Sequence, residues 1–524
     1  MSTRTARAAS ALPLAFVGVL VAWPVAMVLI TGLAPRSLEV LATASTWRIV
    51  AYTTAQALLS TALSLALAMP AAYALYRLRV PGRAAMLAVL TVPFVLPTVV
   101  VGLAFRELLP FAGTTAAIIV AHVFFNVGLV IRVVGGLWAM LDPRWEEVAA
   151  TLGLSPWRAH LRATWPLLRP AITASAILVF LFTFTSFGVV LIVGDPSLPT
   201  IEVDIYQRTV QRLDLSGAAG LALLQLVVVA VALLVSAVLQ DRLAVRQALR
   251  PDAFPARTPA TVLDRAAAAY TVLLAIAVVV PLLALLSRSL RVGGSWGLAW
   301  YAELPSPTDT STRAVPAIEA VGLSLRYAVI ATVIATALGV LAAVGINAAR
   351  RRGALLDAAV TLPLGVSAVT IGFGLLLASL RGPVDMRGWW ILVPLGQALV
   401  AMPVVVRVVL PVLRSLDPRL RQVAGTLGAP PLRAWLATEG AITSRAVAVG
   451  AALACAISLG EFGATAFLVR ADNPTMPIQI VRLLGRPGEA NLGQACALAV
   501  VLVLLTLVVV AVAERLRPAG KGGW

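Results

Sequence analysis

Charged residues are scarce in this chain, and their scarcity excludes a soluble fold. Only 12% of its 524 residues are charged, whereas 60% are hydrophobic. A soluble domain carries roughly a quarter charged residues. Lysine is nearly absent, since Lys521 is the only one. A phosphate-binding loop of the form G-x-x-x-x-G-K-[ST] needs a lysine inside it, so we expect the chain to lack an ATPase site of that kind.

Cysteine and histidine, frequent ligands of transition metals, are also rare. The chain has two of each, and Cys455 and Cys496 both lie in apolar stretches without the spacing of a zinc site. We interpret these two cysteines as packing residues. Paired carboxylates are missing from the apolar stretches, so the sequence offers no candidate acid–base pair. We therefore expect neither an enzyme nor a bound metal or cofactor.

Long hydrophobic runs are what the sequence has in abundance. A helix needs about twenty apolar residues to cross a bilayer core of about 30 Å, and its backbone must form its hydrogen bonds internally. We predict an all-α integral membrane protein with about twelve membrane helices, kinked at prolines such as Pro93, Pro97 and Pro363. The predicted spans cover approximately residues 11–34, 52–76, 84–105, 114–140, 168–194, 218–240, 266–287, 323–347, 354–380, 389–413, 443–469 and 491–513.

The net charge of +18 suggests a nucleic-acid partner at first, but its distribution argues against one. If the spans alternate from a cytoplasmic N-terminus, most arginines fall on the cytoplasmic side, while the acidic residues divide almost evenly. This bias is the positive-inside rule, and it places both termini in the cytoplasm. We expect a multi-pass protein of the bacterial plasma (inner) membrane, whose basic side faces anionic lipid, and no nucleic-acid partner.

The most informative pattern is an internal repeat. Leu141–Gly153 and Leu416–Gly428 carry the same loop 275 positions apart, and Phe187-Gly188 and Phe462-Gly463 keep that offset. The two halves then hold six spans each in the same orientation, a parallel repeat about an axis along the membrane normal. We predict a first half over 1–240 with its loop at about 141–167, a cytoplasmic linker over 241–264, and a second half over 265–524 with its loop at about 416–442.

Each repeated loop has the signals of a short helix followed by a turn and a second helix. Asp142-Pro143 puts a capping residue before a proline at the first helical position. Gly153 marks the end of the helix, because glycine tolerates the left-handed cap. Asp417-Pro418 and Gly428 repeat both signals in the second half. Small residues in these helices would let a partner surface approach closely: Ala149, Ala150 and Ala424.

These loops resemble the coupling loop in the permease subunits of binding-protein-dependent ABC importers. That family carries a Glu-Ala-Ala run, a glycine four residues after the second alanine, and a later Leu-Pro. The first copy matches with Glu147-Val148-Ala149, Gly153 and Trp165-Pro166. The second copy departs from the pattern, with Gln422 for the glutamate and Gly440-Ala441 for the Leu-Pro. The resemblance assigns coupling to an ATPase to Glu147, Ala149, Ala150, Gly153, Gln422, Ala424 and Gly428.

The resemblance covers nearly the whole chain, because fused two-half permeases of this length belong to the thiamine and ferric-iron importer branches. His122–Asn126, Thr200–Gln207 and Ser324–Arg326 look closest to the thiamine branch. The resemblance implies a type I ABC importer fold, two cytoplasmic ATPase subunits that bind the ATP, and an extracytoplasmic substrate-binding protein. The implied function is import of a small solute, thiamine first and ferric iron second, through a path between the halves.

Polar residues inside the spans are candidates for that path. Glu461 is a carboxylate in an apolar span, where a charge costs a few kcal/mol or more. Its equivalent in the first half is Ser186, so the two-fold symmetry breaks at this position. Glu461 either faces a cationic solute or pairs with an arginine such as Arg407, and both interpretations stay open. His122 and Asn126 either line the path or form hydrogen bonds between helices.

Two other classes of function fit parts of the pattern. Twelve spans in two parallel repeats also describe ion-coupled secondary transporters. However, the loop Tyr76–Arg83 lacks the Gly-x-x-x-Asp-Arg-x-Gly-Arg-Arg mark of that class. A membrane-embedded enzyme would need converging acids or histidines, and the sequence shows none. The outer segments 195–217 and 288–322 carry several acids, and they are either solvated turns or a landing surface for an external partner.

Overall fold

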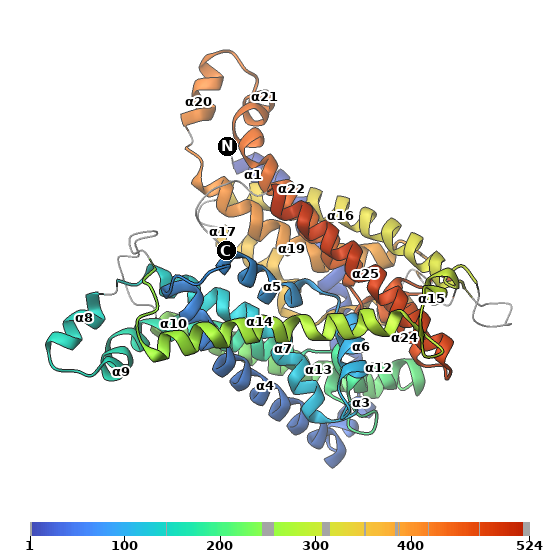
Figure 1. Cartoon of the computed structure of the whole chain (residues 1–524). Helices are drawn as coiled ribbons and strands as arrows, with labels where there is room; N and C mark the ends of the chain where they lie inside the picture. The colour runs from blue at the N-terminus through green and yellow to red at the C-terminus, as the bar shows by residue number, and fades with distance from the viewer. Residues whose placement is uncertain are drawn as a thin grey trace.

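Helices account for nearly all of the computed structural model (Figure 1). The structure describes residues 3–142, 144–243, 256–306, 315–349, 353–382, 386, 388–417, 419–470 and 472–516. In this part of the chain, ten helices are long and apolar enough to cross a membrane. Two bent pairs raise the number of possible crossings to twelve. The predicted all-α membrane fold is therefore confirmed.

The first half begins with a composite span and ends with α13. The composite span consists of α1, a π-helical turn η1 and α2, and the repeated loop carries α8, α9 and η2. The bounds are α1 Thr3–Val17, η1 Gly18–Ala22, α2 Trp23–Gly32, α3 Pro35–Leu41, α4 Ala44–Arg77, α5 Arg83–Val95, α6 Thr98–Leu108, α7 Thr115–Met140, α8 Arg144–Thr151, α9 Pro156–Ala159, η2 His160–Thr164, α10 Trp165–Phe184, α11 Gly188–Val193, α12 Ile201–Tyr206, η3 Gln207–Gln211 and α13 Leu215–Leu243.

The second half repeats this order, as the sequence offset predicts. A small antiparallel hairpin follows its first span, with Arg291 opposite Trp296. The bounds are α14 Val262–Ser289, β1 Arg291–Val292, β2 Ser295–Trp296, α15 Ala299–Ala302, α16 Ala317–Ala348, α17 Gly353–Gly365, α18 Ala368–Arg381, α19 Leu392–Ser415, α20 Arg419–Thr426, α21 Pro431–Trp435, η5 Leu436–Gly440, α22 Ala441–Gly460, α23 Thr465–Leu468, α24 Met476–Leu484 and α25 Glu489–Leu516.

The predicted kinks turn out to be full breaks between helices. α5 meets α6 at 104°, and α17 meets α18 at 82°. Pro97 precedes α6, and Leu96 before it is extended with φ −69° and ψ 144°. Extended backbone is what a residue before proline prefers. In the second half, Ser367 caps α18 by accepting the Val369 N–H at 3.1 Å. The third and ninth predicted spans are therefore broken pairs rather than straight crossings.

Two other predicted spans end earlier than their hydropathy suggests. α10 ends at Phe184 and α22 ends at Gly460, and each is followed by a break and a short helix. Glu461 consequently lies just past the end of a membrane helix and not inside it. Such breaks are tolerated because side chains and neighbouring helices can satisfy a broken backbone that is buried in protein.

The first span of each half packs on the other half. α1 lies against α16 and α17, and α2 lies against α18 as well as α13. In return, α14 lies against α4, α5 and α6 of the first half (Figure 1). Each bundle therefore includes a span from the other half, and this exchange ties the two halves together.

The end of the linker is fixed to the first half. The Arg257 carbonyl accepts the Arg79 N–H at 2.8 Å, next to the end of α4. The Arg257 guanidinium lies 3.0 Å from the Asp264 carboxylate. Thr261 and Asp264 form a capping box that starts α14. Residues 244–255 of the predicted linker lie outside the described residues.

Candidate functional site

The first repeated loop folds into the predicted helix, turn and second helix. The Arg144 N–H donates to Asp142 Oδ1 at 2.9 Å at the start of α8. Gly153 adopts φ +81° after the helix. The Leu154 N–H then donates to the Ala149 carbonyl at 3.2 Å. This bond and the left-handed glycine close the helix in the manner of a Schellman motif.

The second loop has the same geometry. The Arg419 N–H donates to Asp417 Oδ1 at 2.9 Å, and Gly428 adopts φ +82°. The Ala429 N–H donates to the Ala424 carbonyl at 3.1 Å. No atom lies within 4 Å of a Cβ built on either capping glycine. Glycine is therefore required at both places for its backbone conformation and not for space. The predicted caps Asp142 and Asp417 and the predicted glycine ends of both helices are confirmed, whereas Pro143 and Pro418 lie outside the described residues.

Each loop extends away from the helical bundle and presents apolar side chains to its surroundings (Figure 1). In α8, Trp145 is 60% exposed, Val148 53%, and Leu152, just past its end, 78%. In the second loop, Val423 is 57% exposed and Leu427 is 82% exposed. Residues three and four apart share one face of a helix. We call these five residues the apolar stripes. Such exposed apolar surface marks a site of contact with a partner.

The apolar stripes were not predicted from the sequence, where the small residues were favoured instead. Ala149 is only 8% exposed in the chain alone, and the close approach of a partner at this residue stays a prediction. Ala424 is half-buried. The spacing of apolar residues at 145, 148 and 152 was the available signal. The side chains of several predicted coupling residues and helix starts lie outside the described residues: Glu147, Ala150, Gln422, Pro143 and Pro418.

A carboxylate that the sequence analysis did not single out fastens the first loop to the membrane helices. Glu146 Oε1 lies 3.1 Å from His160 Nδ1 and accepts a bond from the Thr164 hydroxyl. The His160 ring stacks on Trp138 at 5.4 Å. Partial burial raises the pKa of the Glu146 carboxyl, but the hydrogen bonds from His160 and Thr164 outweigh it. The pKa therefore lies below its ordinary value of 4.5.

Replacing Glu146 by Gln is expected to loosen the first loop by about 1 kcal/mol or less, because the carboxylate is partly exposed. A lowered folded-state pKa gives stabilisation that is complete above the ordinary carboxyl pKa and is lost as pH falls through the lowered value. Hydrogen exchange of backbone amides over residues 144–164 measures both effects. The second loop serves as the internal control. A Glu146→Gln chain that keeps the acid-induced loosening would contradict this role.

Glu461 caps the short helix that follows it. Its carboxylate accepts the Ala464 N–H at 2.7 Å and the Thr465 N–H at 3.0 Å, and also the Thr465 hydroxyl. These bonds satisfy the first N–H groups of α23, which have no partner within that helix. Arg407 lies 3.4 Å from Asp357 instead of pairing with Glu461. The expectation of an ion pair between Arg407 and Glu461 is therefore wrong.

Ser186 occupies the equivalent position in the first half, in the break between α10 and α11. It is half-buried, whereas Glu461 is 7% exposed. The predicted asymmetry between the two halves therefore exists in the structure, and it includes the cap that Glu461 supplies to α23. A direct contact of either residue with a solute stays a prediction.

His122 and Asn126 lie one turn apart on α7. His122 is 2% exposed, and its Nδ1 lies 3.3 Å from the Ser60 hydroxyl of α4. Asn126 donates to the His122 carbonyl at 2.8 Å. The contact with Ser60 is a hydrogen bond between helices, the simpler of the two interpretations of His122. Lining of the path by either residue stays a prediction.

The two halves meet at a pair of equivalent aromatic residues. Phe187 and Phe462 stack with their ring centroids 4.9 Å apart and their planes 10° from parallel. They are 5% and 3% exposed. Tyr206 packs on Phe187 at 5.2 Å and on Phe467 of the second half at 5.8 Å. In the sequence the two phenylalanines are matched only as part of the repeat, and no role was predicted for them.

Two acids of the first outer segment are buried. Glu202 is 0% exposed and Asp204 is 1% exposed, both in α12. Arg208 pairs with Asp204 at 2.9 Å, one helical turn away. The interpretation of segment 195–217 as solvated turns is therefore wrong for these two acids. Their burial could not be inferred from charge, which usually indicates a solvated position.

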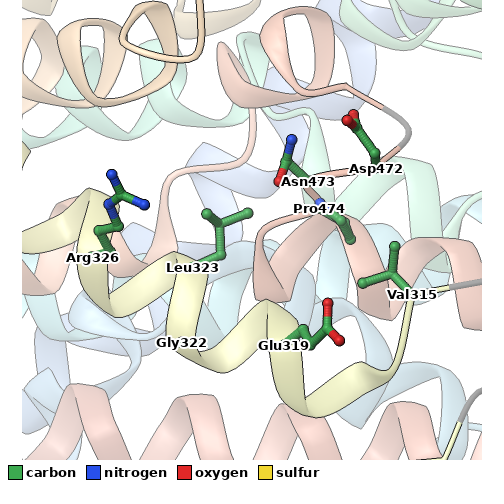
Figure 2. Close-up of a pocket in the computed structure, with 8 residues that line it drawn as sticks. All are labelled: Val315, Glu319, Gly322, Leu323, Arg326, Asp472, Asn473 and Pro474. Carbon is green, nitrogen blue, oxygen red and sulfur yellow. The ribbon is translucent and has the colours of Figure 1, made fainter.

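Remote from the repeated loops (Figure 1), a cavity of about 290 Å³ opens between the start of α16 and the segment before α24 (Figure 2). Figure 2 shows Glu319 and Arg326 on one helix and Asp472 on the facing segment. Within the described ranges, no group of three or more His, Cys, Asp or Glu residues is arranged to hold a metal ion. The mixed charge around this open cavity fits a landing surface for an external partner better than it fits a metal site. The lining residues are Val315, Glu319, Gly322, Leu323, Arg326, Asp472, Asn473 and Pro474.

Comparison with known proteins agrees with this geometry. Residues 64–248 match the family described as binding-protein-dependent transport system inner membrane component. That stretch contains the first repeated loop, the break at Glu461's equivalent Ser186, and α12. The matched family supplies the membrane component of importers that work with an ATPase and an external binding protein.

Several relatives resemble the chain, and those named for thiamine transport do so over both halves. The thiamine transport system permease protein ThiP of Escherichia coli strain K12 is 28% identical over 506 residues, which covers 90% of this chain and 89% of that protein. ThiP of Brucella abortus strain 2308 is 28% identical over 499 residues, 91% of this chain and 88% of that protein. The E. coli sulfate transport system permease protein CysT is 31% identical over 169 residues, 29% of this chain and 61% of that protein. These similarities together support a fused two-half permease of the binding-protein-dependent ABC importers, with both permease halves in one polypeptide.

Proposed function

We propose that this permease moves thiamine across the inner membrane, driven by two cytoplasmic ATPase subunits and supplied by an extracytoplasmic binding protein. The observation that carries the proposal is the duplicated loop, whose two apolar stripes offer one docking element per half. ATP is bound by the partner subunits, and this chain contributes the path and the coupling. The relatives named for thiamine cover about nine tenths of the chain, which supports that solute.

Coupling follows from a change in the distance between the two loops. Each loop is capped at both ends, so α8 and α20 move as short rigid elements. Glu146 connects the first loop to η2 at the start of the span formed by α10. If the ATP-bound form of the ATPase pair fits one loop spacing better than another, its closure shifts the halves between two arrangements. The solute path then opens alternately on each side.

The orientation of the protein follows from its charge. The positive-inside bias places the repeated loops and both termini in the cytoplasm. The cavity beside Glu319 and Asp472, remote from the loops, then faces outward, where the binding protein delivers its solute. Ferric iron, our second expectation for the solute, has no support among the relatives described above, whose names refer to thiamine and sulfate.

Reconstitution tests the proposed solute directly. Proteoliposomes that contain the permease with its ATPase subunits, together with the cognate binding protein, are expected to accumulate radiolabelled thiamine only when ATP is supplied. An ion gradient without ATP should give no accumulation, because the chain depends on its partners for energy. Ferric iron should not be accumulated.

A catalytically inactive ATPase subunit is the matched control for this experiment, since it preserves assembly and removes the energy source. Accumulation on an ion gradient alone would reject the importer mechanism and revive the secondary-transporter alternative. Accumulation of another solute, with none of thiamine, would reject the proposed solute and keep the mechanism.

A further inference from the structure

The stacked phenylalanines Phe187 and Phe462, called here the aromatic pair, lie at a special place in the molecule. They are equivalent residues of the two halves, 275 positions apart. A contact between a residue and its own equivalent lies on the approximate two-fold axis that relates the halves. In a permease with parallel halves, that axis runs along the membrane normal between the bundles. The aromatic pair therefore stands across the route that a solute takes.

The backbone around the aromatic pair is irregular on both sides. Phe187 precedes α11 with φ −104° and ψ −64°, and Phe462 lies between α22 and α23. Irregular backbone at membrane depth is tolerated where it is buried in protein or lines a cavity. Broken helices at equivalent places of two repeats point to the solute site of a transporter.

Small residues bring the halves into direct contact at this level. A Cβ on Gly188 would lie 3.2 Å from the Phe462 ring, and a Cβ on Gly460 would lie 3.1 Å from Pro97 of the other half. Each glycine thus permits a close approach that alanine would disturb. In this conformation the two halves are in direct contact at the aromatic pair.

Further aromatic rings surround the pair. Tyr206 contacts both Phe187 and Phe467, so it bridges the two halves. Phe373 packs against Phe467 at 6.2 Å from the far side. Tyr206 and Phe467 thus form side walls next to the stacked rings. Walls of this kind suit a flat π system, and aromatic faces also attract a cation.

A buried carboxylate without a cationic partner lies close to these walls. Glu202 precedes Tyr206 by one helical turn on α12, so the two side chains share a face. Glu202 accepts a bond from Gln225 and lies beside Ser367 of the second half. Within the described ranges, no arginine, lysine or histidine pairs with it. A buried carboxylate in this state favours the arrival of a positive charge.

We propose that the aromatic pair is the closed gate of the solute path, and that a planar, positively charged aromatic ring passes by inserting between the two phenyl rings. The identity of the ring rests on the proposed function. Insertion requires the distance between the two phenyl centroids to increase from 4.9 Å to about 7 Å, which is twice a stacking distance of about 3.5 Å. Separation of the halves supplies this opening, and Glu202 balances the charge of the ring in transit.

Bridging the pair tests the gate. Cys455 and Cys496, the two native cysteines, are first replaced by alanine. Phe187→Cys and Phe462→Cys are then joined by a short reducible thiol-specific bridge in the reconstituted importer. We expect uptake to fall at least ten-fold on bridging and to return on reduction. Uptake at the unbridged rate after complete bridging would overturn the gate.

The chain offers a matched control for the bridge. Phe94 and Phe182 pack within the first half with their ring centroids 5.8 Å apart and their planes tilted by 57°, and they are 42% and 45% exposed. A bridge between cysteines at these two positions links two helices of one half and leaves the path free. It is expected to change uptake less than two-fold. An equal loss of uptake from both bridges would show that any cross-link in this region blocks transport, which would overturn the assignment to the aromatic pair.

The class of solute is tested separately. Phe187→Leu with Phe462→Leu keeps apolar bulk and removes the π faces, and we expect thiamine uptake to fall about ten-fold. Glu202→Gln should lower it by a similar factor, whereas Glu39→Gln, at an exposed site on α3, should leave it unchanged. Full uptake in the leucine and glutamine variants would reject the aromatic cation.

Failure of the gate can be distinguished from failure of the proposed function. If the unaltered importer moves another solute and no thiamine, the bridge is repeated with the solute that the binding protein carries. Loss of that uptake on bridging would support the aromatic pair as the gate and reject only the aromatic cation as its solute. A dye-release assay on vesicles is independent of any solute, and Phe187→Ala with Phe462→Ala is expected to raise release several-fold. Unchanged release together with unchanged uptake would overturn the gate.

Discussion

A chain that carries both Leu152→Asp and Leu427→Asp is expected to lose ATP-driven uptake by at least a hundred-fold while still inserting into the membrane. The two leucines are 78% and 82% exposed, so they contribute little to the fold of the permease alone. Each contributes about 1.5–3 kcal/mol when it is buried against a partner. A buried unpaired carboxylate costs more again. A hundred-fold loss corresponds to only about 2.8 kcal/mol, which the two sites together exceed.

Three measurements separate this explanation from misfolding. Membrane insertion and thermal unfolding of the purified variant should match those of the unaltered chain, while co-purification of the ATPase subunits and uptake should both be lost. Leu152→Met with Leu427→Met keeps the apolar bulk and serves as the matched control. A double-aspartate chain that still retains its ATPase subunits would contradict docking through the apolar stripes.

The single variants address whether the two loops contribute equally. The first stripe has Trp145, Val148 and Leu152, whereas the second has Val423 and Leu427 among its described residues. We expect Leu152→Asp and Leu427→Asp each to reduce uptake, because one detached loop prevents the coordinated movement of both halves. The comparison of their effects measures the share that each loop carries.

The repeat and the caps could be predicted because their signals are local. An aspartate before a proline and a glycine in the left-handed region determine the start and end of α8 and α20 without help from the rest of the fold. Hydropathy likewise identified the membrane helices. It could not show that the kink predicted near Pro97 is a full break between α5 and α6, nor that α10 and α11 are separate helices, because an apolar run of suitable length predicts one helix.

Contacts between distant segments could not be predicted from the sequence either, because they depend on packing between neighbouring helices. The partner of Arg407 is Asp357, fifty positions away, and nothing local favours it over Glu461. The exchange of α1 and α14 between the halves depends on packing, which leaves no periodic signal. The stack of Phe187 on Phe462 follows only once the repeat is combined with an axis between the halves. The equal offset suggested the equivalence, and the structure supplied the contact.

Glu461→Ala is expected to cost more stability than any other single change at the breaks between helices. Three hydrogen bonds to its carboxylate are lost, and the N–H groups of Ala464 and Thr465 stay buried without an acceptor. Each such group costs about 1–3 kcal/mol. Thermal unfolding of the purified chain in detergent should show a clearly lowered Tm. Ser186→Ala, at the equivalent and less buried position, should change the Tm by much less.

Glu461→Gln then separates a structural cap from a contact with the solute. Glutamine keeps one acceptor oxygen, so it should retain part of the cap and recover much of the lost Tm. If the cap is the whole role of Glu461, uptake recovers with the Tm in this variant. If the carboxylate also meets a cationic solute, the Tm recovers while uptake stays low. Because the carboxylate already accepts three bonds within its own segment, we expect uptake and stability to recover together. A glutamine variant with restored stability and persistent loss of uptake would contradict that expectation, and would place the solute at α23 instead of beside Glu202.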